Sequence, residues 1–204
     1  SKKYFLLLFV ILLFPTFSWT QNSILIFNED FETGNYSFMA DSSFGLPHGI
    51  NSWVVNNEYN GNGIYPNTTS QTNTVSGTIG NPGGYYLHIS DTTQITNVSN
   101  ANYDTQNSSD HFYVLDRSFC TLGFDSIEFS FFYLCEGSNT DYAEVFYSID
   151  GGNWISCGSQ YKNQTLWKNE RIMNPAFNNV YDLRFGFRWV NASSTLASSI
   201  SFGV

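Results

Sequence analysis

Strict alternation of apolar and polar side chains constrains the second half of this chain more than any other feature. Residues 180–190 place one apolar set on one parity: Tyr181, Leu183, Phe185, Phe187 and Trp189. The intervening positions carry Asp182, Arg184, Gly186 and Arg188. An alternation with period two predicts a β-strand that buries one face in a core.

The same alternation recurs in residues 127–133 and 143–149 of the stretch Asp125–Trp154, which we interpret as a β-meander. Asp150-Gly151-Gly152-Asn153 then predicts a tight turn, because glycine adopts positive φ without strain. Further strands are expected at residues 23–31, 53–55, 85–89, 112–115, 154–157 and 200–204, with a possible edge strand at 74–79. No stretch shows sustained apolar spacing of the helical kind. The pattern predicts an all-β fold, an antiparallel β-sandwich of jelly-roll type.

The first twenty residues have the features of a secretory signal peptide. Lys2 and Lys3 precede an apolar run at residues 4–14, and small residues surround a cleavage point before Gln21. An uncleaved anchor is the alternative, although the run is shorter than the roughly 20 residues that span a bilayer. We expect a secreted protein that is either free in the extracellular space or attached to the cell surface, with one domain over residues 21–204 and no membrane span after cleavage.

Charge excludes one class of partner. Removal of residues 1–20 leaves six basic and 17 acidic residues, a formal charge of −11. Such a surface repels nucleic acid and is compatible with calcium or with neutral or cationic partners, although solubility alone explains it too.

Cys120, Cys135 and Cys157 make an odd number of cysteines. Export would permit a disulfide, and we favour Cys135 with Cys157, which leaves one free thiol. Their spacing matches no zinc motif.

Four segments in order resemble a known family: residues 27–34 (FNEDFETG), 86–89 (YLHI), 148–154 (SIDGGNW) and 201–204 (SFGV). Together they resemble the MAM-like jelly rolls of bacterial secreted proteins. These include the cleaved-adhesin domains of gingipain-type proteases and the choice-of-anchor modules of type IX-secreted surface proteins. The resemblance covers residues 24–204 and implies a MAM/concanavalin-like topology. It also implies a last strand that is cut short at Val204 and further C-terminal domains.

The resemblance further implies a structural calcium ion that ties strand ends together. Its acidic ligands map onto Glu29, Glu32 and Asp141, while the family's closing acids are absent from this sequence. Calcium takes six to eight oxygen ligands, which carboxylates and loop carbonyls can supply. The alternative is that Glu29 and Glu32 are solvated charges that protect a sheet edge.

A second candidate site lies on the polar parity of the long strands. Jelly rolls can bind sugars on a sheet face, where aromatic rings stack on the sugar and arginine binds its hydroxyl groups. Our candidates are Phe132, Phe146, Arg184 and Arg188. The alternative is that this face packs against a loop or the other sheet, and that the arginines pair with Asp182 and Glu144.

No catalytic pattern stands out. The acids Glu29, Asp30 and Glu32 share one strand, and neither a G-x-S-x-G nor an H-E-x-x-H motif occurs. We therefore expect a non-catalytic module for adhesion or glycan binding, whose partner is an extracellular glycan or protein. The alternatives are an accessory domain of a secreted peptidase or glycoside hydrolase and, less favoured, a hydrolase.

Overall fold

A computed structural model describes residues 23–31, 36–45, 49–56, 85–91, 103–195 and 201–204. These residues form strands and a single turn of 3₁₀ helix at Pro175–Phe177, without any α-helix. The strands are β1 Phe38–Asp41, β2 Asn51–Asn56, β3 Tyr86–Asp91, β4 Ser109–Leu115, β5 Glu128–Cys135, β6 Tyr142–Ile149, β7 Ile155–Tyr161, β8 Gln164–Met173 and β9 Leu183–Asn191. The expectation of an all-β fold is confirmed.

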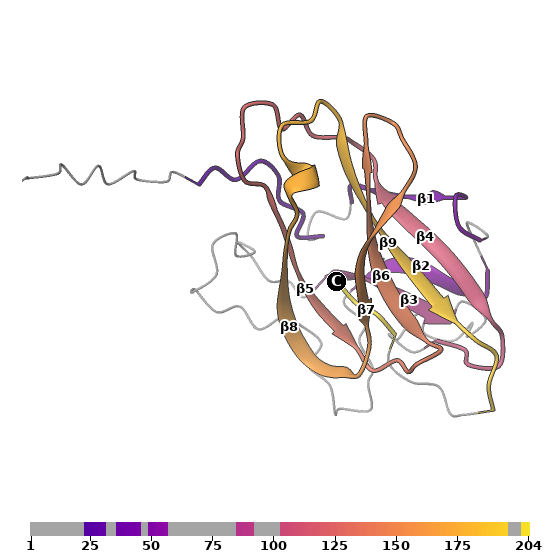
Figure 1. The fold of residues 1–204 in the computed structure, drawn as a ribbon. Coiled ribbons are helices and arrows are strands. Elements are labelled where there is room, and N and C mark those ends of the chain that lie inside the picture. The colour runs from indigo at the N-terminus through magenta and orange to yellow at the C-terminus, as the bar shows by residue number, and fades with distance from the viewer. Residues whose placement is uncertain (1–22, 32–35, 46–48, 57–84, 92–102, 196–200) are drawn as a thin grey trace, which may run out of the picture.

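Five strands form the first sheet in the order β1-β4-β9-β6-β7, and every neighbouring pair is antiparallel. The second layer contains two antiparallel pairs, β2-β3 and β5-β8. Figure 1 shows β5 and β8 on one side of the molecule and β4, β9 and β6 on the other. The arrangement is therefore an antiparallel β-sandwich of jelly-roll type, in which the chain crosses repeatedly between the layers.

Residues 201–204 join the two pairs of the second layer. Leu87 and Val204 exchange two backbone hydrogen bonds of 2.8 and 2.9 Å. On the other side, Leu134 and Gly203 exchange two of 2.8 and 3.1 Å. Both bridges are antiparallel, so the segment lies between β3 and β5 and completes a continuous second sheet.

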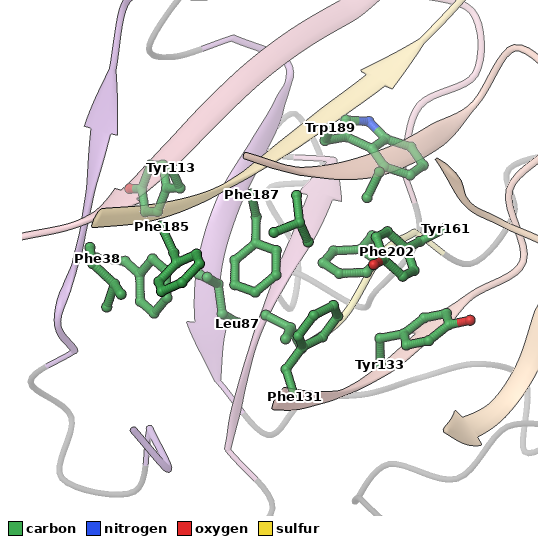
Figure 2. Packing of buried hydrophobic residues seen from close by; sticks show 14 of the residues in the cluster. Phe38, Leu87, Tyr113, Phe131, Tyr133, Tyr161, Phe185, Phe187, Trp189 and Phe202 are labelled. Atoms are coloured by element: carbon green, nitrogen blue, oxygen red, sulfur yellow. The ribbon is translucent and has the colours of Figure 1, made fainter. Parts of the chain in front are cut away.

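Aromatic rings fill the space between the sheets, as Figure 2 shows. Phe187 of β9 packs against Phe131 of β5, with ring centroids 5.1 Å apart, and against Phe202, at 5.6 Å. Phe202 also touches Trp53, Tyr133 and Tyr161. Rings from both layers therefore meet around Phe202.

Most expected strands are confirmed, including β2, β3, β4, β7 and β9. In β9 the buried residues are Leu183, Phe185, Phe187 and Trp189, whereas Tyr181 precedes the strand and is 73% exposed. The strand β8 was not expected. The expected edge strand at 74–79 and the signal peptide lie outside the described residues.

Three predictions are wrong. Residues 23–31 form no strand, and the first strand of the described residues is β1, which pairs with β4. The meander is also wrong, because β5 pairs with β8 and β6 with β7 and β9, in different sheets. The third is the disulfide: all three cysteines are free thiols, and Cys135 and Cys157 lie on strands of different sheets.

Among the described residues, no helical segment combines the length and the hydrophobicity of a transmembrane span.

Replacing Phe202 with alanine tests the closing role of residues 201–204. Phe202 has no exposed surface, and its removal leaves a cavity between the sheets. We expect Phe202→Ala to lower the free energy of unfolding by about 3–5 kcal/mol, measured by urea denaturation. Tyr181→Ala, at an exposed ring, is the control and should change it by less than about 0.5 kcal/mol. Equal effects would contradict the role of Phe202.

His88 predicts a dependence of stability on pH. It is fully buried on β3, where burial lowers its pKa to about 4 against the opposing hydrogen bond to the Ile89 carbonyl. The folded state thus favours neutral histidine, and its stabilising contribution is complete above pH 6.5 and is lost as pH falls towards 4. We expect a loss of about 2 kcal/mol between pH 7 and pH 5 in chemical denaturation. His88→Gln should show a clearly smaller loss over the same interval, and an unchanged slope would refute the assignment.

Candidate functional site

Three of the four predicted ligand-binding residues lie together on the outer face of the first sheet. Phe146 of β6 is opposite Gly186 of β9, and Ser148 is opposite Arg184. Arg188 is opposite Glu144 on one side and Phe112 of β4 on the other. Because their neighbours in sequence enter the core, these side chains point away from the second sheet.

The fourth residue, Phe132, does not join them. It lies on β5 of the second sheet and packs against Tyr86, Leu134 and Trp167. On β5, Phe132 and Leu134 alternate with the core residues Phe131 and Tyr133, so Phe132 belongs to the outer face of the other layer. The prediction of one shared site for all four residues is wrong because β5 and β6 belong to different sheets.

Phe146 is covered by the chain segment that follows β1. The ring of Phe44 lies 4.7 Å from that of Phe146 and 4.9 Å from that of Phe112. Phe146 is consequently only 6% exposed. This part of the face packs against a loop, as our alternative reading held, and the Phe146 ring has no free face to offer a sugar.

Gly45 holds that covering segment against the sheet. Its φ is +61°, a conformation that favours glycine, and an added Cβ would collide with the backbone carbonyl of Asp110. Ahead of it, the carboxylate of Asp41 accepts a hydrogen bond of 2.7 Å from the backbone N–H of Ser43. These contacts fix the approach of Phe44 to the sheet.

Arg188 is neutralised by carboxylates. Its Nε and one terminal nitrogen donate to the two oxygens of Asp110, at 2.8 and 2.6 Å, and its other terminal nitrogen lies 3.4 Å from Glu144. Its guanidinium also covers the ring of Phe44, 4.7 Å from the centroid. The hydrogen bonds to Asp110 raise the pKa of Arg188, against the effect of burial. Arg188 thus contacts the Phe44 ring while it is paired with carboxylates of β4 and β6.

Beside this covered area, the outer face opens into a groove of about 520 Å³. The turn between β6 and β7 forms one side and residues 43–44 contribute to the other. Its lining is Ser43, Phe44, Ser148, Gly151, Gly152, Asn153, Trp154, Asp182 and Arg184. The groove therefore combines two half-buried aromatic rings with hydroxyl, amide, carboxylate and guanidinium groups.

Trp154 and Arg184 are in contact within the groove. The guanidinium carbon of Arg184 lies 5.8 Å from the centre of the Trp154 ring, and Phe112 packs edge-on against the same ring at 4.9 Å. A terminal nitrogen of Arg184 donates a 2.8 Å hydrogen bond to the carbonyl of Leu115. Both side chains are thus held from more than one direction.

Hydrogen bonds hold the turn at residues 150–153. Asp150 and Gly151 both have positive φ, as in the tight turns that match strand twist. The N–H of Gly152 donates to Ile149, and the hydroxyl of Ser148 donates to the Gly152 carbonyl, each at 2.8 Å. The predicted turn is confirmed, but we assigned it no functional part and missed Asn153 and Trp154. The only signal was the aromatic residue directly after the turn.

Asp182 completes the groove. Its backbone N–H donates to the carboxylate of Asp150 and its carbonyl accepts from the N–H of Asp150, at 3.0 and 2.8 Å. Its Oδ1 atom is buried and has no hydrogen-bond partner within the described part of the chain. The residue as a whole is half-buried and lines the groove, so it adds a carboxylate to this part of the lining.

The predicted calcium ligands do not converge. Glu29 accepts backbone N–H groups from Phe31 and Ser37, beside the start of β1, at 2.9 and 2.8 Å. Asp141 accepts from the hydroxyl of Tyr103 and the N–H of Ala192, beyond the far end of β9. The length of β4, about 20 Å, separates these ends of the sheet.

Donor groups already surround both carboxylates, so Glu29 and Asp141 do not fit a shared calcium ion. Among the described residues, no three His, Cys, Asp or Glu side chains cluster as a metal site. Glu32 lies outside the described residues, and calcium binding there stays a prediction.

Gly45 gives a direct test of how the Phe44 segment is held. We expect Gly45→Ala to lower the free energy of unfolding by about 2–3 kcal/mol, because strain at positive φ adds to the collision with Asp110. Gly123→Ala is the matched control, since Gly123 also has positive φ but nothing within 4 Å of an added Cβ. It should cost only about 1 kcal/mol in the same thermal denaturation experiment. Equal losses would show that the collision is relieved without cost.

Comparisons with known proteins find similarity to solved structures, of which two are described. No family model matches the chain, and no curated protein matches it in sequence. Among solved structures, TmCBM61 in complex with beta-1,4-galactotriose aligns at 15% identity and a TM-score of 0.41, over 85% of this chain and 87% of that one. The enzymatically active domain of tailspike protein 4 of bacteriophage CBA120 aligns at 10% identity and a TM-score of 0.43, over 82% of this chain and 18% of that one.

Proposed function

We propose that this chain is an exported, non-catalytic module that binds a glycan in the groove beside the β6–β7 turn. The observation that carries the proposal is the lining of that groove. Half-buried Trp154 and Phe44 stand beside Asp182, Arg184 and Asn153 in one open depression on a sheet face.

Sugars need this combination of groups. A pyranose ring has an apolar face of C–H groups, which an aromatic ring can cover, and a rim of hydroxyls, which carboxylate, amide and guanidinium groups can bind. The volume of about 520 Å³ falls within the usual range of small-ligand sites, roughly 300–1,000 Å³. The side chains are also fixed before a ligand arrives, which lowers the entropic cost of binding.

The acids of the described chain support a binding role over hydrolysis. Glycoside hydrolysis generally uses two carboxylates about 5–10 Å apart across the scissile bond. Asp182 is the one carboxylate among the residues that line the groove. Glu128 and Glu144, two acids on the outer faces of strands, are paired with Arg171 and Arg188.

Export and attachment to the cell surface rest on the sequence. Residues 1–20 have the organisation of a signal peptide, and the resemblance to MAM-like jelly rolls supports adhesion as the setting for glycan binding.

A glycan array tests the proposal, followed by titration of the best ligand. We expect Trp154→Ala to weaken binding at least about tenfold, or about 1.4 kcal/mol, because a central aromatic contact is lost. Met173→Ala is the control, since Met173 is 63% exposed on β8 of the other sheet. Each variant is compared only if its melting curve matches the wild type.

Two outcomes would contradict the proposal. Binding that is insensitive to Trp154→Ala would place the ligand outside the groove. New reducing ends in the bound glycan, measured after prolonged incubation, would refute the non-catalytic assignment.

A further inference from the structure

We propose that the glycan carries carboxylate groups, as uronic acids do, and that Arg184 binds one of them. This inference deepens the proposed function and depends on it. It concerns the class of sugar that the groove selects.

The ion pairs of the arginines single out Arg184. The chain has four arginines, all within the described residues. Three have a carboxylate partner: Arg117 with Asp116, Arg171 with Glu128, and Arg188 with Asp110 and Glu144. Arg184 forms no ion pair with an acid of the described chain, although 15 of the 17 acids are described.

The contrast is sharpest within β9. Arg184 and Arg188 lie on the same face of one strand, four residues apart. All three guanidinium nitrogens of Arg188 donate hydrogen bonds to Asp110 or Glu144. Arg184 donates one hydrogen bond, to a neutral backbone carbonyl, and lines the groove. One arginine therefore stabilises the sheet, and the other keeps most of its five N–H donors for a ligand.

Its position suits a planar anion. Contact with the Trp154 ring restricts the guanidinium, and the hydrogen bond to Leu115 fixes one of its corners. A guanidinium fork held in this way matches both oxygens of a carboxylate through two parallel hydrogen bonds. A neutral hydroxyl group uses only part of that geometry.

The remaining polar groups suit the hydroxyls of the same sugar. Asp182 is an acceptor for hydroxyl groups, while Ser43, Ser148 and Asn153 can both donate and accept. Asp182 would repel a second carboxylate on the sugar. The groove therefore offers one contact for a carboxylate, at Arg184, and several contacts for neutral hydroxyl groups. A sugar that carries a single carboxylate among its hydroxyls has this distribution.

The overall charge makes non-specific attraction a poor explanation for such binding. The formal charge of the chain is −9, which repels a polyanion at long range. Affinity for an acidic glycan must then come from a local site.

Calorimetric titration of the full chain with matched oligosaccharides tests the inference. The probes are oligogalacturonate, the same oligomer as its methyl ester, alginate oligomers and a neutral gluco-oligosaccharide. We expect the free acids to bind at least about tenfold more tightly than the ester, because the ester removes a charged hydrogen-bond pair. Oligogalacturonate and alginate separate one uronic acid from another.

Variants of Arg184 and of Trp154 complete the design. Arg184→Gln should remove the preference for free acid over ester, and Arg184→Lys should keep part of it, since lysine retains charge without the fork. Trp154→Ala should weaken binding of acid and ester together.

The outcomes separate the two proposals. Equal affinity for acid and ester, or equal losses for both in Arg184→Gln, would overturn the carboxylate assignment and leave glycan binding in place. Binding of none of these sugars, nor of any on the glycan array, would overturn both. Binding of acidic peptides in preference to the sugars would also contradict the inference.

Discussion

The packing of Phe202 between the sheets is the interaction on which the rest of the structure depends. Residues 201–204 supply the backbone groups that pair with both β3 and β5, and without them the second layer would consist of two separate hairpin-like pairs. A pair of strands alone is at best marginally stable in water, whereas a sheet of three or more strands with one buried apolar face can be stable. Phe202 ties this central segment to Phe187 of the opposite layer. Residues 201–204 therefore connect the two strand pairs into one sheet and anchor that sheet to the opposite layer.

The packing of the inner face also fixes which residues of the first sheet lie on its outer face. In β9 the core receives Leu183, Phe185, Phe187 and Trp189, and the outside receives the residues between them. The register of each strand is thus strongly specified, because a shift by one residue would move its core side chains to the surface. The register of β6 and β9 also sets the positions of the residues that line the groove. Arg184 stands beside Trp154 because Arg184 is paired with Ser148, which begins the turn that carries Trp154.

Alternation predicted which faces are buried, and it did so correctly for β5, β6 and β9. It could not predict partners, since a strand with one apolar face fits either layer, and the pairing of β5 with β8 depends on residues distant in sequence. The strand β8 was missed because it is an exposed edge in which Trp167 is the single buried residue. Residues 23–31 misled us for the opposite reason. Their apolar character suggests a strand, but Glu29 bonds to the N–H of Phe31, whose φ is +59°, and turns the chain instead.

The same limit applies to the candidate site. Sequence parity identified Arg184, Arg188 and Phe146 as neighbours on one outer face, which the register of β6 and β9 bears out. Their different environments come from other strands. Asp110 at the start of β4 reaches Arg188, while the positions of β4 beside Arg184 offer only a backbone carbonyl. Two arginines with equivalent places in an alternating pattern thus acquire opposite roles. The tertiary packing, which places Asp110 beside Arg188, therefore decides which arginine is paired with carboxylates and which lines the groove without an ion pair to an acid of the described residues.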